Sequence, residues 1–88
     1  MNKLFSDDAW EDYCSWLDDK RIQKKINSLL KDIENNGNSG IGKPEPLKYE
    51  LTEYWSRRIT DKDRLIYKID TETDTIIIIG CKGHYEEM

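Results

Sequence analysis

The sequence has few of the residues on which metal and redox sites depend: its 88 residues include two cysteines and one histidine. This set does not complete a four-ligand zinc site without carboxylates, and we expect Cys14 and Cys81, which lie far apart, to be free thiols. No apolar run approaches the roughly 20 residues of a membrane helix, and the longest, Ile76 to Ile79, is the size of a strand. Acidic residues begin at Asp7, too early for a secretion signal, so we expect a cytosolic protein with no membrane partner.

Length and charge limit the function further. The length predicts one small domain spanning residues 1–88. The formal net charge is −4, but its distribution is uneven, because residues 43–68 carry a net charge of +2 while the flanking segments are acidic. Phosphate contacts dominate nucleic-acid affinity. An RNA-binding role would therefore require the middle segment to act locally, or another molecule to hold the RNA.

Hydrophobic periodicity predicts two helices near the N-terminus. After a short strand at Lys3–Phe5, Ser6 is a helix cap that precedes a helical stripe of Trp10, Tyr13, Cys14 and Leu17. A second helix is predicted from about Lys20 to Asn35, with an apolar stripe of Ile22, Ile26, Leu29, Leu30 and Ile33. The expected core includes Trp10, Tyr13, Ile22, Ile26, Leu29 and Ile78. The basic residues on the other faces of this helix form either a solvated surface or a nucleic-acid contact: Lys20, Arg21, Lys24, Lys25 and Lys31.

Beyond the glycine-rich loop that ends the second helix, the pattern changes to period two. Alternation predicts a strand at Leu47–Leu51, a strand in which Trp55, Arg57 and Ile59 share one face, a turn at 60–63, and a strand with Leu65, Tyr67 and Ile69 on one face. The apolar segment 75–81 is predicted to be a central strand. The order β-α-α-β-β-β predicts an α+β fold, with two N-terminal helices packed on one face of a small, mostly antiparallel sheet.

One constellation of residues suits acid–base chemistry on RNA. Cleavage through the 2′-hydroxyl needs a base, an acid and cations near the phosphate. The only histidine is His84, so a carboxylate is the natural second acid–base group. Glu45 lies between Pro44 and Pro46, which hold its backbone stiffly, although Pro-Glu-Pro is also an ordinary rigid turn.

Two arginines point to an anion site. Arg58 and Arg64 are predicted to lie near each other across a hairpin, on the face opposite Leu65. Like charges on one face indicate anion binding, and structural ion pairs with neighbouring acids are the alternative. His84 and Tyr85 follow the last predicted strand, where the chain can return over that face. The residues alone therefore predict a small cationic sheet face with one histidine.

Taken together, these segments resemble the Txe/YoeB toxins of the RelE superfamily. The resemblance rests on Gly40–Lys48, Trp55–Thr60, Arg64–Tyr67 and His84-Tyr85, and it covers nearly the whole chain. It implies the toxin of a type II toxin–antitoxin pair, and a ribosome-dependent endoribonuclease that cuts mRNA in the ribosomal A site and stops translation. It implies no metal or other cofactor. The implied partners are a YefM-like antitoxin, the ribosome with its mRNA, and a second copy in a homodimer.

The resemblance also assigns roles to residues. Glu45 matches the general base, Arg64 the phosphate-stabilising arginine, His84 the general acid and Tyr85 the residue that positions the RNA. Lys48, Arg57 and Arg58 are expected to contact the RNA around the scissile phosphate. The expected products are a 2′,3′-cyclic phosphate, or its hydrolysed form, and a 5′-hydroxyl.

The chain departs from the family pattern in two places. Gly37-Asn38 replaces the Pro-Phe of relatives, so the loop before Glu45 is expected to be less firmly anchored, and Glu86-Glu87-Met88 follow the His-Tyr pair. The alternative function is a toxin-fold protein that inhibits its target by binding without cutting, like the ParE-type toxins.

Overall fold

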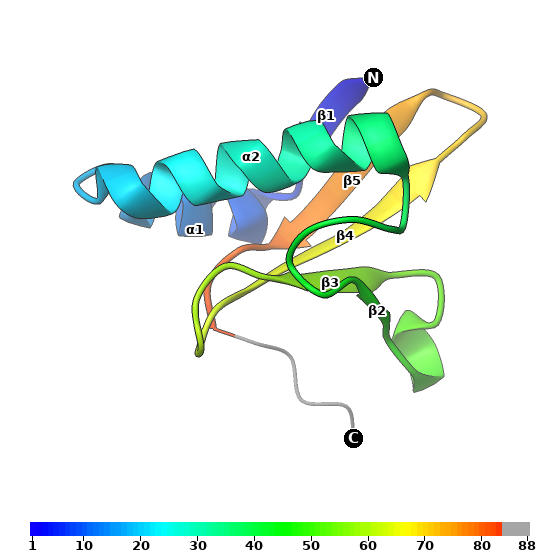
Figure 1. Ribbon diagram of the computed structural model, residues 1–88. Coiled ribbons are helices and arrows are strands. Elements are labelled where there is room, and N and C mark those ends of the chain that lie inside the picture. The colour runs from blue at the N-terminus through cyan, green and yellow to red at the C-terminus, as the bar shows by residue number, and fades with distance from the viewer. Residues whose placement is uncertain (84–88) are drawn as a thin grey trace.

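The computed structural model describes residues 1–83, which form two helices and a five-stranded sheet (Figure 1). The elements in chain order are β1 (Asn2–Phe5), α1 (Asp7–Ser15), α2 (Lys20–Asn36), β2 (Glu45–Pro46), a 3₁₀ turn (Tyr49–Leu51), β3 (Trp55–Arg58), β4 (Arg64–Asp70) and β5 (Thr75–Gly80). The sheet order is β1-β5-β4-β3-β2, and only the β1–β5 pair is parallel. The predicted α+β fold with a mostly antiparallel sheet is confirmed. No helix within residues 1–83 is long and apolar enough to cross a bilayer.

Both helices begin at side-chain caps. The hydroxyl of Ser6 accepts a hydrogen bond from the Ala9 amide at 3.1 Å, and the carboxylate of Asp19 accepts one from the Ile22 amide at 3.2 Å. Such caps satisfy backbone donors that have no partner within the helix. The second helix ends at Gly37, whose positive φ of 62° suits a residue without a Cβ.

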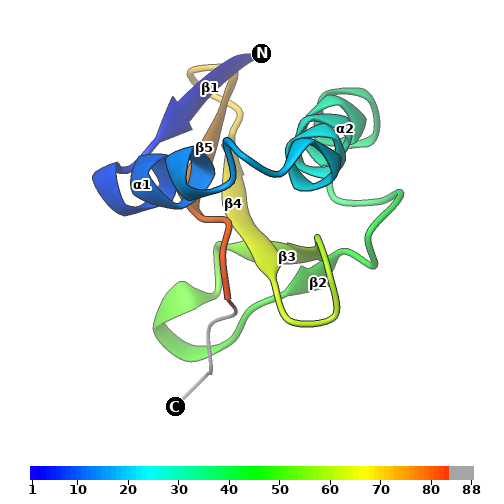
Figure 2. The same cartoon turned by 90° about the vertical axis from the view of Figure 1, so that its left-hand side faces the viewer.

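The core lies between the helices and one face of the sheet. A single cluster of buried side chains joins Ala9 of α1 to Tyr67 of β4 and Ile78 of β5, and α2 contributes its predicted stripe of Ile26, Leu29, Leu30 and Ile33. Both helices therefore cover the same face of the sheet. Figure 2 shows α1 beside β1 and β5. We call the other side, which no described helix covers, the open face.

The prediction that Trp10 belongs to the core is wrong. Its side chain is 53% exposed and stacks on Tyr13, with 5.8 Å between the ring centroids. The inward position is taken by Ala9, which is fully buried. Asp12 faces inward as well, because its carboxylate accepts a hydrogen bond from the Cys81 amide at 3.1 Å. Because a carboxylate occupies an inward position of α1, the hydrophobic pattern alone does not show which face is buried. The predicted stripe therefore begins at Trp10, one residue after the buried Ala9.

The prediction of a strand at residues 47–51 is also wrong. Tyr49 has a φ of +58°, in the left-handed region, and begins the 3₁₀ turn. Extended alternation ends at such a residue. The additional strand is β2, at Glu45–Pro46, two residues earlier than predicted, and it pairs with β3. By contrast, β5 is an internal strand between β1 and β4, as expected.

Candidate active site

The sheet register places three of the predicted functional residues on the open face. Glu45 pairs with Ser56, Ser56 pairs with Ile66, and Arg58 pairs directly with Arg64. Paired residues of antiparallel strands point to the same side, and every second residue of a strand shares that side. Glu45, Arg58 and Arg64 therefore project from β2, β3 and β4 on the side away from the helices. The structure confirms that Arg58 and Arg64 lie opposite each other across the hairpin.

The guanidinium of Arg64 is held at one end, and within residues 1–83 its other end has no protein partner. Its Nη1 donates to the carbonyls of Thr60 at 2.8 Å, Asp63 at 3.0 Å and Asp61 at 3.3 Å. Within residues 1–83, its Nε and Nη2 donate to no protein acceptor. This Nε–Nη2 edge is a fork that can meet two oxygens of one phosphate. The turn carbonyls thus fix the position of the arginine while its binding edge stays open.

Arg58 supplies a second cation at the same place. Its side chain is exposed and has no ion-pair partner in the described part of the chain. Like charges directly opposite each other across two strands destabilise a sheet. An anion bound between Arg58 and Arg64 would remove this repulsion, so the pair favours an anion site over structural ion pairing.

Glu45 presents an exposed carboxylate at the edge of this face. Residues 1–83 provide it with no hydrogen-bond or ion-pair partner. Its backbone is held by pairing with Ser56, and the hairpin closes through a 2.9 Å hydrogen bond from the Leu47 amide to the Tyr54 carbonyl. Lys48 is exposed just beyond this bond. The backbone of Glu45 is therefore held in place, while its carboxylate is exposed on the open face.

The segment after β5 is tied to the turn that carries Arg64. The Arg64 amide donates to the Gly83 carbonyl at 2.7 Å, and the Gly83 amide donates to Asp63 Oδ1 at 2.7 Å. Asp63 Oδ2 accepts a further hydrogen bond from Thr60 Oγ1 at 2.7 Å. Gly83 directly precedes His84 in the sequence. His84 and Tyr85, the predicted acid and positioning residue, lie outside the described residues.

The prediction that Arg57 contacts RNA is wrong, because its side chain is fully buried and all five of its N–H donors have protein partners. Nε donates to the Tyr67 hydroxyl at 3.2 Å, and Nη1 donates to Asp32 at 2.5 Å. The other three donors bind loop carbonyls: Ile41 at 2.9 Å, Gly37 at 2.7 Å and Ser39 at 2.8 Å. A buried charge is stable only when paired and hydrogen-bonded in this way. The sequence indicated this burial, because Arg57 alternates with Trp55 and Ile59 on the inward face of the predicted strand.

This network anchors the loop before Glu45. Asp32 accepts hydrogen bonds from the Ile41 amide at 3.0 Å and from Arg57, and the latter lowers the pKa of the Asp32 carboxyl below its ordinary value. The Tyr67 hydroxyl donates to the Asn38 side chain at 3.1 Å. Burial raises the pKa of Tyr67, so its hydroxyl keeps its proton. The loop is therefore held by polar contacts, contrary to the expectation of weak anchoring.

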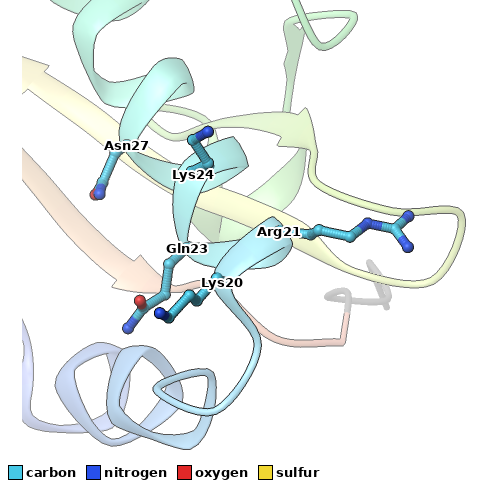
Figure 3. A pocket seen from close by; sticks show the side chains of 5 residues that line it. All are labelled: Lys20, Arg21, Gln23, Lys24 and Asn27. Atoms are coloured by element: carbon cyan, nitrogen blue, oxygen red, sulfur yellow. The ribbon is translucent and has the colours of Figure 1, made fainter.

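A second cationic surface lies on α2, over the opposite side of the sheet from Arg64. A shallow hollow there is lined by Lys20, Arg21, Gln23, Lys24 and Asn27 (Figure 3). Figure 3 shows Arg21 extending away from the other four, and a neighbouring hollow joins Arg21 to the turn residues Thr60 and Asp61. The hollow on α2 is lined by no carboxylate, whereas the neighbouring hollow also includes Asp19 and Asp61.

The two cysteines are free thiols, as predicted. Cys81 is fully buried, and burial raises its pKa to about 12, while Cys14 is partly exposed. A thiol with so high a pKa is a poor nucleophile at neutral pH. Cys81 is therefore a core residue.

The fold is that of small bacterial toxins of known structure. A YoeB dimer structure from Staphylococcus aureus is 50% identical, with a TM-score of 0.88, and covers 97% of this chain and 98% of its own. A heterotetrameric YoeB–YefM toxin–antitoxin complex from the same species gives the same values. Toxin YoeB of Escherichia coli K12 is 46% identical over 97% of this chain and 100% of its own length.

The particular family follows from the sequence match. The family model for the YoeB-like toxin of bacterial type II toxin–antitoxin systems matches residues 5–85. The chain belongs to this family, and the resemblance inferred from the sequence motifs is confirmed.

Proposed function

We propose that this toxin is a ribosome-dependent endoribonuclease that cuts mRNA in the ribosomal A site, and that the open face of β2, β3 and β4 is its catalytic site. One observation carries the proposal: the free guanidinium edge of Arg64 lies opposite Arg58, on the same side of the sheet as the proline-braced Glu45. A positioned base beside a phosphate clamp is what cleavage through the 2′-hydroxyl requires.

In the proposed reaction, the Glu45 carboxylate takes the proton of the 2′-hydroxyl, and the 2′-oxygen attacks the adjacent phosphorus. The bond to the 5′-oxygen breaks, and His84 donates a proton to this leaving oxygen. Arg64 stabilises the charge that accumulates on the phosphate oxygens, and Tyr85 positions the RNA. Lys48 and Arg58 bind the RNA around the scissile phosphate. The products are a 2′,3′-cyclic phosphate and a 5′-hydroxyl.

The charge of the protein supports dependence on the ribosome. The net charge of −4 opposes binding to free RNA, because affinity for RNA depends on phosphate contacts. If the ribosome holds the mRNA, the toxin needs only the local cations of the open face. We propose that the protein acts in the cytoplasm on translating ribosomes.

The partners follow from the solved relatives. The Staphylococcus aureus structures contain a YoeB dimer and a YoeB–YefM complex. We propose that this chain likewise forms a homodimer and is neutralised by a YefM-like antitoxin. Co-expression with a YefM-like antitoxin, followed by co-purification, tests the second partner.

The activity is tested by mapping mRNA 5′ ends after adding the purified toxin to a reconstituted translation system. We expect new ends within the A-site codon and no cleavage of the same RNA without ribosomes at moderate salt. Efficient cleavage of free RNA would contradict ribosome dependence. Arrested translation with intact transcripts would instead support a toxin that inhibits by binding alone.

The role of the histidine is tested separately. His84→Ala is expected to abolish growth inhibition while the thermal unfolding of the protein remains unchanged. Wild-type toxicity of this variant would show that His84 is not the general acid.

A further inference from the structure

We infer that Arg57 is a positioning residue for the Glu45 carboxylate, and this inference rests on the function proposed above. Arg57 lies in β3 between Ser56, which pairs with Glu45, and Arg58, which pairs with Arg64. Its two neighbours therefore face the site, while its own side chain projects from the opposite face of the sheet and contacts the loop that leads to Glu45. Strand β3 thus positions both the Arg58–Arg64 pair and the loop that leads to Glu45.

The guanidinium holds this loop at alternate residues. It binds the carbonyls of Gly37, Ser39 and Ile41, at 2.7, 2.8 and 2.9 Å. These residues belong to a segment with no regular backbone hydrogen bonding and with three glycines, so the loop has little stiffness of its own. Three carbonyls on one buried cation impose a single path between α2 and β2.

The path continues directly to the base. Gly42 follows the clamped segment, and its carbonyl accepts a 2.7 Å hydrogen bond from the Arg58 amide. Gly42 also touches the core, because a Cβ added there would lie 2.8 Å from Leu29. Only Lys43 and Pro44 separate it from Glu45. A displacement of the loop would therefore also displace the Glu45 carboxylate, because only two residues lie between them.

A simple ion pair would not need an arginine here. Asp32 provides the counter-charge at 2.5 Å, and a lysine can pair with a carboxylate equally well. A lysine, however, has only three donors on one nitrogen and lacks the planar fork. It cannot hold Asp32, three carbonyls and the Tyr67 hydroxyl together. Arg57→Lys therefore keeps the buried charge and removes the clamp.

The test is a double-mutant cycle on single-turnover mRNA cleavage in programmed ribosomes. At saturating toxin, we expect Arg57→Lys to slow cleavage about 10- to 100-fold, since small misplacements of catalytic groups have effects of this size, with ribosome affinity unchanged within about twofold. In a Glu45→Gln background, Arg57→Lys should cause no further loss, because both changes remove the same contribution. Additive losses, or wild-type cleavage by Arg57→Lys, would overturn the inference.

A stability control separates positioning from folding. Ile78→Val shortens a fully buried apolar side chain that makes no hydrogen bond to the loop, and we expect it to lower the melting temperature without changing the cleavage rate. Amide hydrogen exchange at Ile41 and Arg58 should accelerate in Arg57→Lys and not in Ile78→Val. Unchanged exchange in Arg57→Lys would overturn the inference even if cleavage falls.

Two further outcomes keep the inference separate from the proposed function. If Arg57→Lys does not fold, Asp32→Asn removes the counter-charge of the guanidinium together with one of the two oxygens that accept from Arg57, Ile41 and Asn36. We expect faster exchange at the Arg58 amide, which binds Gly42 and not Asp32, with a smaller loss of rate; wild-type exchange and rate would overturn the inference. If Glu45→Gln cleaves at the wild-type rate, the assignment of Glu45 as the base fails, and the positioning role of Arg57 fails with it. Additivity with a defective Glu45→Gln contradicts the role of Arg57 alone.

Discussion

Replacing Gly42 with alanine tests how tightly the loop before Glu45 packs on the core. Gly42 has a φ of +81°, and an added Cβ would lie 2.8 Å from Leu29 Cδ2 and 3.2 Å from Arg57 Cβ. Both neighbours are fully buried, so neither has free space to move into. The left-handed backbone costs about 1–2 kcal/mol for a residue with a Cβ, and overpacking costs about 1–3 kcal/mol more. We expect the free energy of unfolding to fall by about 2–5 kcal/mol.

Gly37→Ala is the matched control for this substitution. Gly37 also has a positive φ, +62°, but no atom lies within 4 Å of an added Cβ, so only the backbone cost applies. Urea denaturation followed by tryptophan fluorescence gives the free energy of unfolding of both variants. In thermal unfolding, each kcal/mol corresponds to about 4–8 °C. A loss of less than about 2 kcal/mol in Gly42→Ala would refute the packing of this loop against Leu29 and Arg57.

Three further predictions follow from buried groups. Leu29→Ala should lower the free energy of unfolding by about 3–5 kcal/mol in urea denaturation, because it empties a fully buried site. Cys81, with its pKa raised to about 12, should resist iodoacetamide in the native protein while Cys14 reacts, as mass spectrometry of the alkylated chain will show. The pKa of Asp32 is lowered from 3.8, so its stabilising effect is present above that value and is lost as the pH falls through the lower native value. Acid titrations followed by circular dichroism should therefore show a smaller loss of stability for Asp32→Asn than for the wild type.

The most regular parts of the fold were predictable from the sequence. The stripe of α2 was correct because four of its residues are buried at helical spacing, and no polar residue interrupts them. The hairpin of β3 and β4 was correct as well, so the pairing of Arg58 with Arg64 was predictable from the turn between them. Local periodicity and turn chemistry were sufficient for both features.

Long-range polar contacts explain where the sequence was misleading. Asp12 faces the core because it binds the Cys81 amide, and this contact shifted the expected face of α1 toward Trp10. Arginine is usually a surface residue. The burial of Arg57 depends on loop carbonyls and an aspartate that lie 16 to 25 residues away in sequence. Neither contact produces a periodic pattern in the sequence, so both are seen only in the tertiary structure.

The most direct test of the central claim is the cleavage rate of Arg64→Ala on programmed ribosomes. The Arg64 side chain is partly exposed and hydrogen-bonds only to carbonyls of the 60–63 turn, so the variant should fold. We expect its single-turnover rate to fall by about 100-fold or more, since a group that stabilises transition-state charge is lost, while Lys31→Ala on the helix side cuts at the wild-type rate. Cleavage by Arg64→Ala at the wild-type rate would place the chemistry elsewhere and contradict the account.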